Sequence, residues 1–177
     1  YAKFLGVPEF FPPPGYSSLE GIRFCPTLEF NGVGGGYQGE GSKTVIPAEA
    51  FAKITCRLVP DQKSEDIANK VRQAIEEACP SAVRVEVELK GGGDPYVVIP
   101  PGKPGSSGQE SELMKKAFSV AEDCIESGFG TRPIFLREGG SIPIIQDLKE
   151  LAGLDSLMIG LFTNEDNLHA PDESFNL

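Results

Sequence analysis

Residues 50 to 58 alternate between two sets of side chains, the period-2 pattern of a strand with one buried face. Arg57 belongs to the second set, so we expect its side chain to point away from the core. A shorter strand is predicted over residues 27–30, ahead of a glycine-rich stretch from Gly32 to Gly41. The set predicted to face the core comprises Ala50, Ala52, Ile54, Cys56 and Leu58.

An amphipathic helix is predicted after this strand. Ser64, followed by two acidic residues, is a typical helix cap, and Pro80 closes the segment. Beyond the helix, alternating apolar and charged residues over 83–89 predict a second half-buried strand that ends at three glycines. The order of these elements is β-β-α-β. The apolar face of the helix comprises Ile67, Val71, Ala74, Ile75 and Ala78.

The second half of the chain has a different pattern. Residues 100–108 (PPGKPGSSG) have the composition of a linker, and we place a domain boundary there. A nearly all-apolar strand over 157–162 is typical of a sheet covered on both faces, so we expect a parallel βαβ crossover here. The elements predicted beyond the linker are a helix from Leu113 to about Gly128, a strand over 134–136, a helix over 142–152 and the strand over 157–162.

Two remaining segments are expected to lie on the surface. Residues 1–24 contain three consecutive prolines and are expected to form a connector. The glycine-rich stretch contains Gly34-x-Gly36-x-x-Gly39, which fits a dinucleotide fingerprint. A strand follows it instead of a helix, so no helix amino terminus is available for a phosphate, and we expect a flexible turn that faces a ligand.

The amino-acid composition disfavours several classes of partner and of metal or redox site. The 177 residues include 26 acidic and 16 basic side chains, a net charge of −10, which disfavours nucleic acid and anionic membranes as partners. No apolar run approaches the roughly 20 residues that cross a bilayer, so we expect a soluble protein. The four cysteines form no Cys-x-x-Cys pair, which argues against a zinc knuckle or a redox motif, and we expect a reduced, cytoplasmic protein.

Residues 137–143 (REGGSIP) form the first loop with candidate chemistry, since they would leave a parallel strand and open a helix. The paired glycines, including Gly140, allow the backbone to approach a ligand closely. Ser141 can cap the helix, whose first amides are available to an anion. An ordinary strand-to-helix turn is the alternative interpretation.

The second candidate loop, residues 164–173, contains His169, the only histidine of the chain. An imidazole can bind a metal, but one histidine does not complete the tetrahedral set that zinc requires, so a bystander histidine is the alternative. The acidic residues around it, Asp166, Asp172 and Glu173, are candidates to assist the histidine, although their charge is also typical of a solvated loop.

Four motifs stand in a fixed order along the chain: GYQGEGSKTVIP at 36–47, RLVP at 57–60, REGGSIP at 137–143 and HAPDE at 169–173. Together they resemble the dinuclear-zinc metallopeptidase family that contains carnosinase, glutamate carboxypeptidase and succinyl-diaminopimelate desuccinylase. Their order and spacing are similar to those of its dipeptidase branch. The likeness runs over nearly the whole chain.

The resemblance implies a fold of the α/β and α+β classes. Residues 1–24 would be a connector, 25–99 a partial ferredoxin-like lid or dimerisation domain, and 100–177 the C-terminal βαβ part of a catalytic domain. The family's lid has four strands and two helices, so its first strand and helix are expected to be missing. A lid without them is expected to expose a sheet edge and apolar surface.

The resemblance also implies a function. The complete enzyme would be a homodimer, joined through its lid, that uses two zinc ions, with manganese or cobalt as alternatives. It would cleave a dipeptide or related small amide with a free carboxylate. His169 matches a zinc ligand, and Gly140 and Ser141 match positions that meet the substrate. Thr44 and Arg57 match lid positions that grip the carboxylate, a role that suits the two-pronged guanidinium.

The family's other metal ligands and its catalytic glutamate have no counterpart in the 177 residues, and neither does its lid histidine. The resemblance therefore implies that these residues are inactive alone, as a C-terminal part of a longer enzyme. A non-enzymatic dimerisation or binding module derived from the same family is the alternative.

Overall fold

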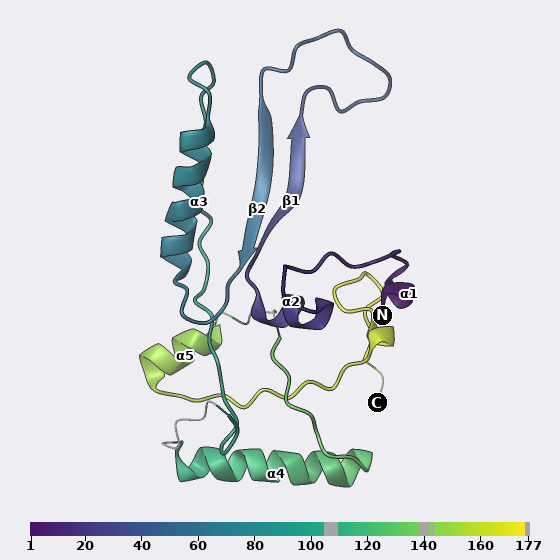
Figure 1. The fold of residues 1–177 in the computed structure, drawn as a ribbon, viewed down its shortest axis with the longest axis vertical. Coiled ribbons are helices and arrows are strands. Elements are labelled where there is room, and N and C mark those ends of the chain that lie inside the picture. The colour runs from purple at the N-terminus through teal and green to yellow at the C-terminus, as the bar shows by residue number, and fades with distance from the viewer. Residues whose placement is uncertain (105–109, 139–141, 143, 176–177) are drawn as a thin grey trace. The chain divides into compact units, whose positions relative to one another are not determined.

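The computed structural model describes residues 1–104, 110–138, 142 and 144–175, and it has a mixed α/β fold (Figure 1). The chain divides into two compact units, Tyr1–Val97 with Ile134–Gly153, and Val98–Pro133 with Leu154–Leu177. In the described part of the chain, no helix is long and apolar enough to span a membrane. The elements are α1 (Ala2–Leu5), α2 (Ser18–Phe24), β1 (Thr27–Gly35), β2 (Ala50–Arg57), α3 (Ser64–Ala78), α4 (Glu112–Phe129), α5 (Ile144–Ala152) and a 3-10 turn, η1 (Asn164–Asp166).

β1 and β2 form an antiparallel hairpin in the first unit, which confirms the strand predicted from residue 50. Thr27 pairs with Arg57 at one end, and Gly35 pairs with Ala50 at the other. β1 is longer than the predicted 27–30 because the first glycines continue the ladder. Backbone hydrogen bonds need no side chain, and the aromatic ring of Phe51 fills the space over one of these glycines.

The hairpin has an apolar face, as the alternation predicts. Leu28 pairs with Cys56, Phe30 with Ile54 and Val33 with Ala52. A register irregularity between Phe30 and Gly32 keeps the apolar residues of β1 on this face on both sides of it. Phe30 is 64% exposed and Val33 76%, so the face is not buried in this chain. The result agrees with the expectation that the lid exposes apolar surface.

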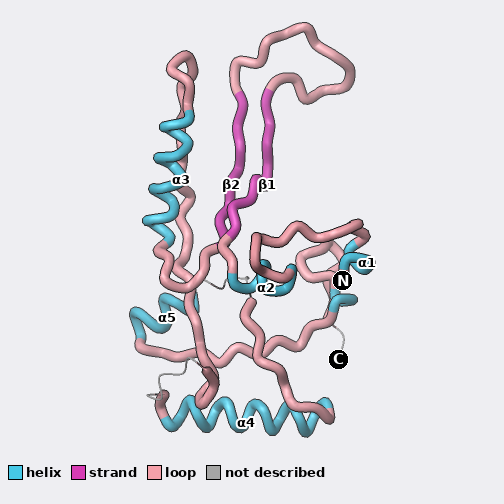
Figure 2. The backbone as a smooth tube through the Cα atoms, viewed as in Figure 1, coloured by secondary structure: helices cyan, strands magenta, loops and turns pink. Residues whose placement is uncertain are grey.

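α3 forms where the amphipathic pattern predicts it, but its cap differs. Ser64 is the first residue of the helix, and Lys63 occupies the cap position without a side-chain hydrogen bond. The carboxylate of Asp94 accepts a hydrogen bond from the Ser64 backbone N–H at 2.8 Å instead. After α3 the chain returns along the helix as a loop, from the Cys79 end to Asp94 at the start (Figure 2).

The strands predicted over 83–89, 134–136 and 157–162 are not formed, so the predicted βαβ crossover is wrong for the described residues. The alternation of side chains specifies which face of a strand is buried, but it does not supply a neighbouring strand. In the described part of the chain, β1 and β2 are the only helices or strands that pack closely against each other.

Two helices occur where the sequence predicted only a connector. α2 begins with a capping box, in which Ser17 Oγ accepts from the Glu20 N–H and Glu20 Oε2 accepts from the Ser17 N–H. In the second unit, α4 confirms the helix predicted from Leu113. It ends at Phe129, and Gly130 caps it with a φ of 71°. Phe118 of α4 is the only buried large apolar side chain among the described residues.

Candidate active-site residues

Arg57 is the last residue of β2 and lies on the face of the hairpin opposite the apolar one. The exposed Lys53 and Thr55 share its face of the strand, because residues two and four apart in a strand point the same way. Arg57 itself is exposed, as the alternation predicted.

Thr44 lies in the loop between β1 and β2, at the apex of a tight turn. The Val45 backbone N–H donates to the carbonyl oxygen of Lys43 at 3.0 Å, so three residues make the turn with Thr44 in the middle. The side chain of Thr44 is exposed.

Thr44 and Arg57 therefore lie at opposite ends of one hairpin (Figure 1). The eight residues of β2 span about 23 Å at about 3.3 Å per residue, and the loop with Thr44 extends beyond the far end. Two residues so far apart cannot hold the same carboxylate of a small substrate from a single chain.

Gly140 and Ser141 lie outside the described residues. The residues that lead to them are held against α2 within the first unit. The Arg23 guanidinium lies 3.5 Å from the Glu138 carboxylate, and the Arg137 guanidinium lies 5.4 Å from the centroid of the Phe24 ring.

His169 lies in an ordered loop of the second unit. Its φ is 68°, in the left-handed region, and its backbone N–H donates to Glu173 Oε2 at 3.2 Å. The loop is anchored by Asp166, which is fully buried and accepts from the Thr163 N–H at 2.7 Å. The prediction of a solvated loop is therefore wrong for Asp166. The spacing Thr163-x-x-Asp166 is a capping signal that the sequence contained.

The described residues do not by themselves complete a metal site. Among the described residues, no group of three or more His, Cys, Asp or Glu side chains is arranged so that it could hold a metal ion. His169 is exposed, and one carboxylate oxygen of Glu173 already accepts the histidine's backbone N–H. A metal ligand at His169 would therefore need partners from residues outside this described set.

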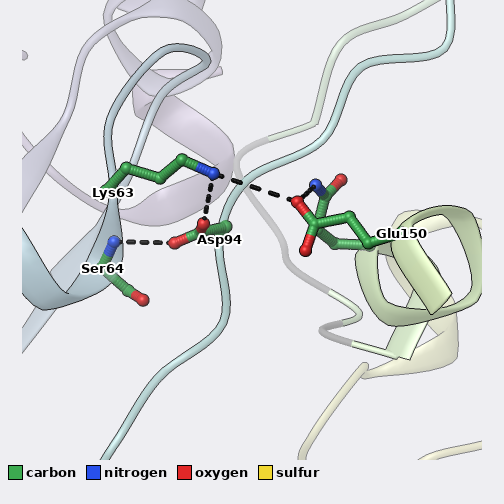
Figure 3. Close-up of polar contacts among 5 residues, drawn as sticks. Lys63, Ser64, Asp94 and Glu150 are labelled. Atoms are coloured by element: carbon green, nitrogen blue, oxygen red, sulfur yellow. Dashed lines mark hydrogen bonds and ion pairs between the residues drawn. The ribbon is translucent and has the colours of Figure 1, made fainter.

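A cluster of ion pairs that the sequence did not predict lies at the start of α3 and comprises Lys63, Asp94 and Glu150 (Figure 3). Lys63 Nζ is 2.8 Å from Asp94 Oδ2 and 3.9 Å from Glu150 Oε1. The hydrogen bond from Lys63, followed by the one from the Ser64 N–H, lowers the pKa of Asp94 to about 2. The same carboxylate raises the pKa of Lys63. No local pattern relates residues 31 positions apart, so the pairing was invisible in the sequence.

An open pocket of about 340 Å³ borders this cluster of ion pairs. Its acidic side chains include Glu65, Asp66 and Asp147, and of the predicted site residues that the structure describes, Thr44, Arg57 and His169, none lines it. The pocket is consequently separate from Thr44, Arg57 and His169.

Comparison with known proteins relates the first unit to one family. The family model described as the M20 peptidase dimerisation domain matches residues 17–83. The Cys-Gly metallodipeptidase DUG1 of Candida albicans is 30% identical over 155 residues, which are 86% of this chain and 29% of the relative. The human Beta-Ala-His dipeptidase is 25% identical over 154 residues, 85% of this chain and 28% of the relative.

The fold agrees with the same family. The crystal structure of human carnosine dipeptidase 1 superposes with a TM-score of 0.76 at 24% identity, covering 99% of this chain and 35% of that one. The chain thus spans about three tenths of the length of the curated relatives it matches. Residues 17–83 match the M20 peptidase dimerisation domain, and homologues of this chain are metal-dependent dipeptidases of the M20 family.

Proposed function

We propose that the complete protein is a metal-dependent hydrolase that cleaves dipeptides or related small amides with a free carboxylate. The lid would comprise residues 25–99, and residues 100–177 would belong to the catalytic domain. The observation that carries the proposal is the position of Arg57, which is exposed at the end of a strand within the segment matched to the dimerisation domain.

Arg57 would bind the substrate carboxylate. A guanidinium donates two parallel hydrogen bonds to a carboxylate, and this geometry selects a planar anion. The net charge of −10 repels small anions in general, so a carboxylate substrate needs a defined cation to hold it.

Thr44 would contact the same carboxylate from a second copy of the chain. The length of β2 separates Thr44 and Arg57 within one chain, whereas a homodimer formed through the lid can bring the Thr44 loop of one copy to Arg57 of the other. The exposed apolar face of the hairpin, with Phe30 and Val33, supports the proposal of a covering partner.

His169 would be one ligand of the metal centre, for which we propose two zinc ions, with manganese or cobalt as alternatives. A bound metal of this kind polarises a carbonyl and activates water. Gly140 and Ser141 would contact the substrate. Because the chain spans only about three tenths of the length of its curated relatives, we propose that the 177 residues are inactive alone.

The test uses the full-length protein with the dipeptides Cys-Gly and β-Ala-His, each beside its C-terminal amide. We expect hydrolysis of the free acids, loss of hydrolysis with a chelator, and recovery with added zinc. The amides should be poor substrates, since they lack the charge that Arg57 binds. A stable dimer without metal-dependent hydrolysis would contradict the proposal and favour a non-enzymatic dimerisation module.

A further inference from the structure

Tyr37 lies in the loop that carries Thr44 and makes two contacts that constrain this loop. Its phenol O–H donates to the carbonyl oxygen of Glu40 at 3.2 Å. The ammonium of Lys43 lies 5.4 Å from the centroid of its ring. Lys43 is also the first residue of the turn closed by the Val45 N–H, so the ring contacts the residue immediately before Thr44.

The phenol also covers the backbone of Gly39. A Cβ built on Gly39 would lie 2.4 Å from the Tyr37 hydroxyl oxygen, so no side chain fits there while the phenol keeps its place. At the entrance of the loop, Gln38 Nε2 donates to the carbonyl oxygen of Gly35 at 2.6 Å, which ties the loop to the end of β1.

The glycine-rich loop that carries Thr44 loses much conformational entropy when it becomes ordered. Glycine loses more freedom on ordering than any other residue, so a glycine-rich loop samples many conformations unless side chains restrict it. The contacts of Tyr37 with Glu40, Gly39 and Lys43 restrict the path that leads to Thr44.

We propose that Tyr37 is a positioning residue, which holds the loop so that Thr44 is presented to the substrate carboxylate. The inference rests on the proposed function, in which Thr44 contacts that carboxylate. A preordered loop lowers the cost of binding. The carboxylate is not one of the reacting groups, so loss of Tyr37 should raise KM and leave kcat nearly unchanged.

Three variants separate the contacts in the full-length enzyme. Tyr37→Phe keeps the ring and loses the hydroxyl, Tyr37→Ala loses both, and Gly39→Ala displaces the phenol without removing it. We expect KM to rise about three- to tenfold for Tyr37→Ala and Gly39→Ala, and less for Tyr37→Phe. Gly128→Ala in α4 is the matched control, because the added Cβ meets nothing within 4 Å.

A double-mutant cycle with Thr44 distinguishes positioning from a general structural role. If Tyr37 acts through Thr44, Tyr37→Ala should change KM little in a Thr44→Ala background. Additive effects, or a KM unchanged by Tyr37→Ala alone, would overturn the inference.

Amide hydrogen exchange at Val45 tests the positioning without any activity. We expect faster exchange in Tyr37→Ala than in the wild type and in Gly128→Ala, because the turn around Thr44 opens more often. Unchanged exchange would overturn the inference. A wild-type enzyme that fails to hydrolyse dipeptides would instead contradict the proposed function, and the exchange measurement would still decide the role of Tyr37.

Discussion

Asp94 caps helix α3 from 30 residues away: its Oδ1 accepts a hydrogen bond from the Ser64 N–H at 2.8 Å. The other carboxylate oxygen binds Lys63, which also lies near Glu150 of α5. One carboxylate therefore connects the start of α3 with the loop that returns along it. It supplies the acceptor that the cap residue of α3 lacks.

Replacement of Asp94 should destabilise the protein through two interactions, the helix cap and the ion pair with Lys63. Asp94→Ala loses the cap and the ion pair, and we expect a fall in the midpoint of thermal unfolding of about 2 to 4 °C. Asp94→Asn keeps an oxygen for the Ser64 N–H and should lose less. Lys63→Ala removes only the ion pair and serves as the matched control. Equal midpoints for wild type and Asp94→Ala would show that the cap contributes nothing.

The contribution of Asp94 should depend on pH. Its pKa is about 2 in the folded state against an ordinary value of 3.8, so the unfolded state binds the proton more readily between these values. The stabilisation is therefore present above pH 3.8 and is lost as the pH falls towards 2. The difference in unfolding midpoint between wild type and Asp94→Asn should shrink over this range. A difference independent of pH would contradict the assignment.

Local patterns in the sequence predicted helices and strands, but they did not predict the contacts between residues far apart in the chain. The period of α3 and the alternation of β2 are properties of neighbouring residues, and both elements formed as predicted. The alternation over 83–89 is equally regular, yet a strand also needs a partner, and none lies beside it among the described residues. The capping box of Ser17 and Glu20 was a local signal for α2 that the neighbouring prolines outweighed.

The same distinction between local and long-range information applies to the candidate site residues. The outward direction of Arg57 followed from the strand period alone. The separation of Thr44 and Arg57 followed only in part. The length of the predicted strand lies between them, but the path of the loop with Thr44 beyond the strand was not predicted. The burial of Asp166 was missed although a local signal existed. Its charge alone indicates a solvated residue, whereas its spacing to Thr163 is that of a capping box.

Replacement of Arg57 should weaken substrate use without unfolding the lid. A charge-assisted hydrogen-bond pair contributes about 1.5 to 3 kcal/mol, so Arg57→Ala in the full-length enzyme should lower kcat/KM about ten- to a hundredfold. Arg57→Lys should recover only part of the loss, because an ammonium lacks the two-pronged geometry. Lys53→Ala, on the same face of β2, is the control and should leave kcat/KM within about twofold.

Replacement of His169 should lower the content of bound metal as well as the activity. His169 has a φ of 68°, a conformation that asparagine and glycine tolerate. His169→Asn and His169→Gly therefore remove the imidazole without new backbone strain. We expect both full-length variants to be purified with less than the wild-type metal content, as measured by elemental mass spectrometry. Full metal content in both variants would exclude His169 as a ligand. Leu168→Ala, at an exposed neighbour without a positive φ, is the control.

Subunit mixing tests the central claim most directly. Thr44→Ala and Arg57→Ala chains of the full-length enzyme are each assayed alone, and then unfolded and refolded together so that heterodimers form. If one copy supplies Thr44 and the other Arg57, each heterodimer contains one intact site and should recover about half of the wild-type activity per dimer. Activity of the mixture that stays at the level of the separate variants would contradict a site shared between two copies.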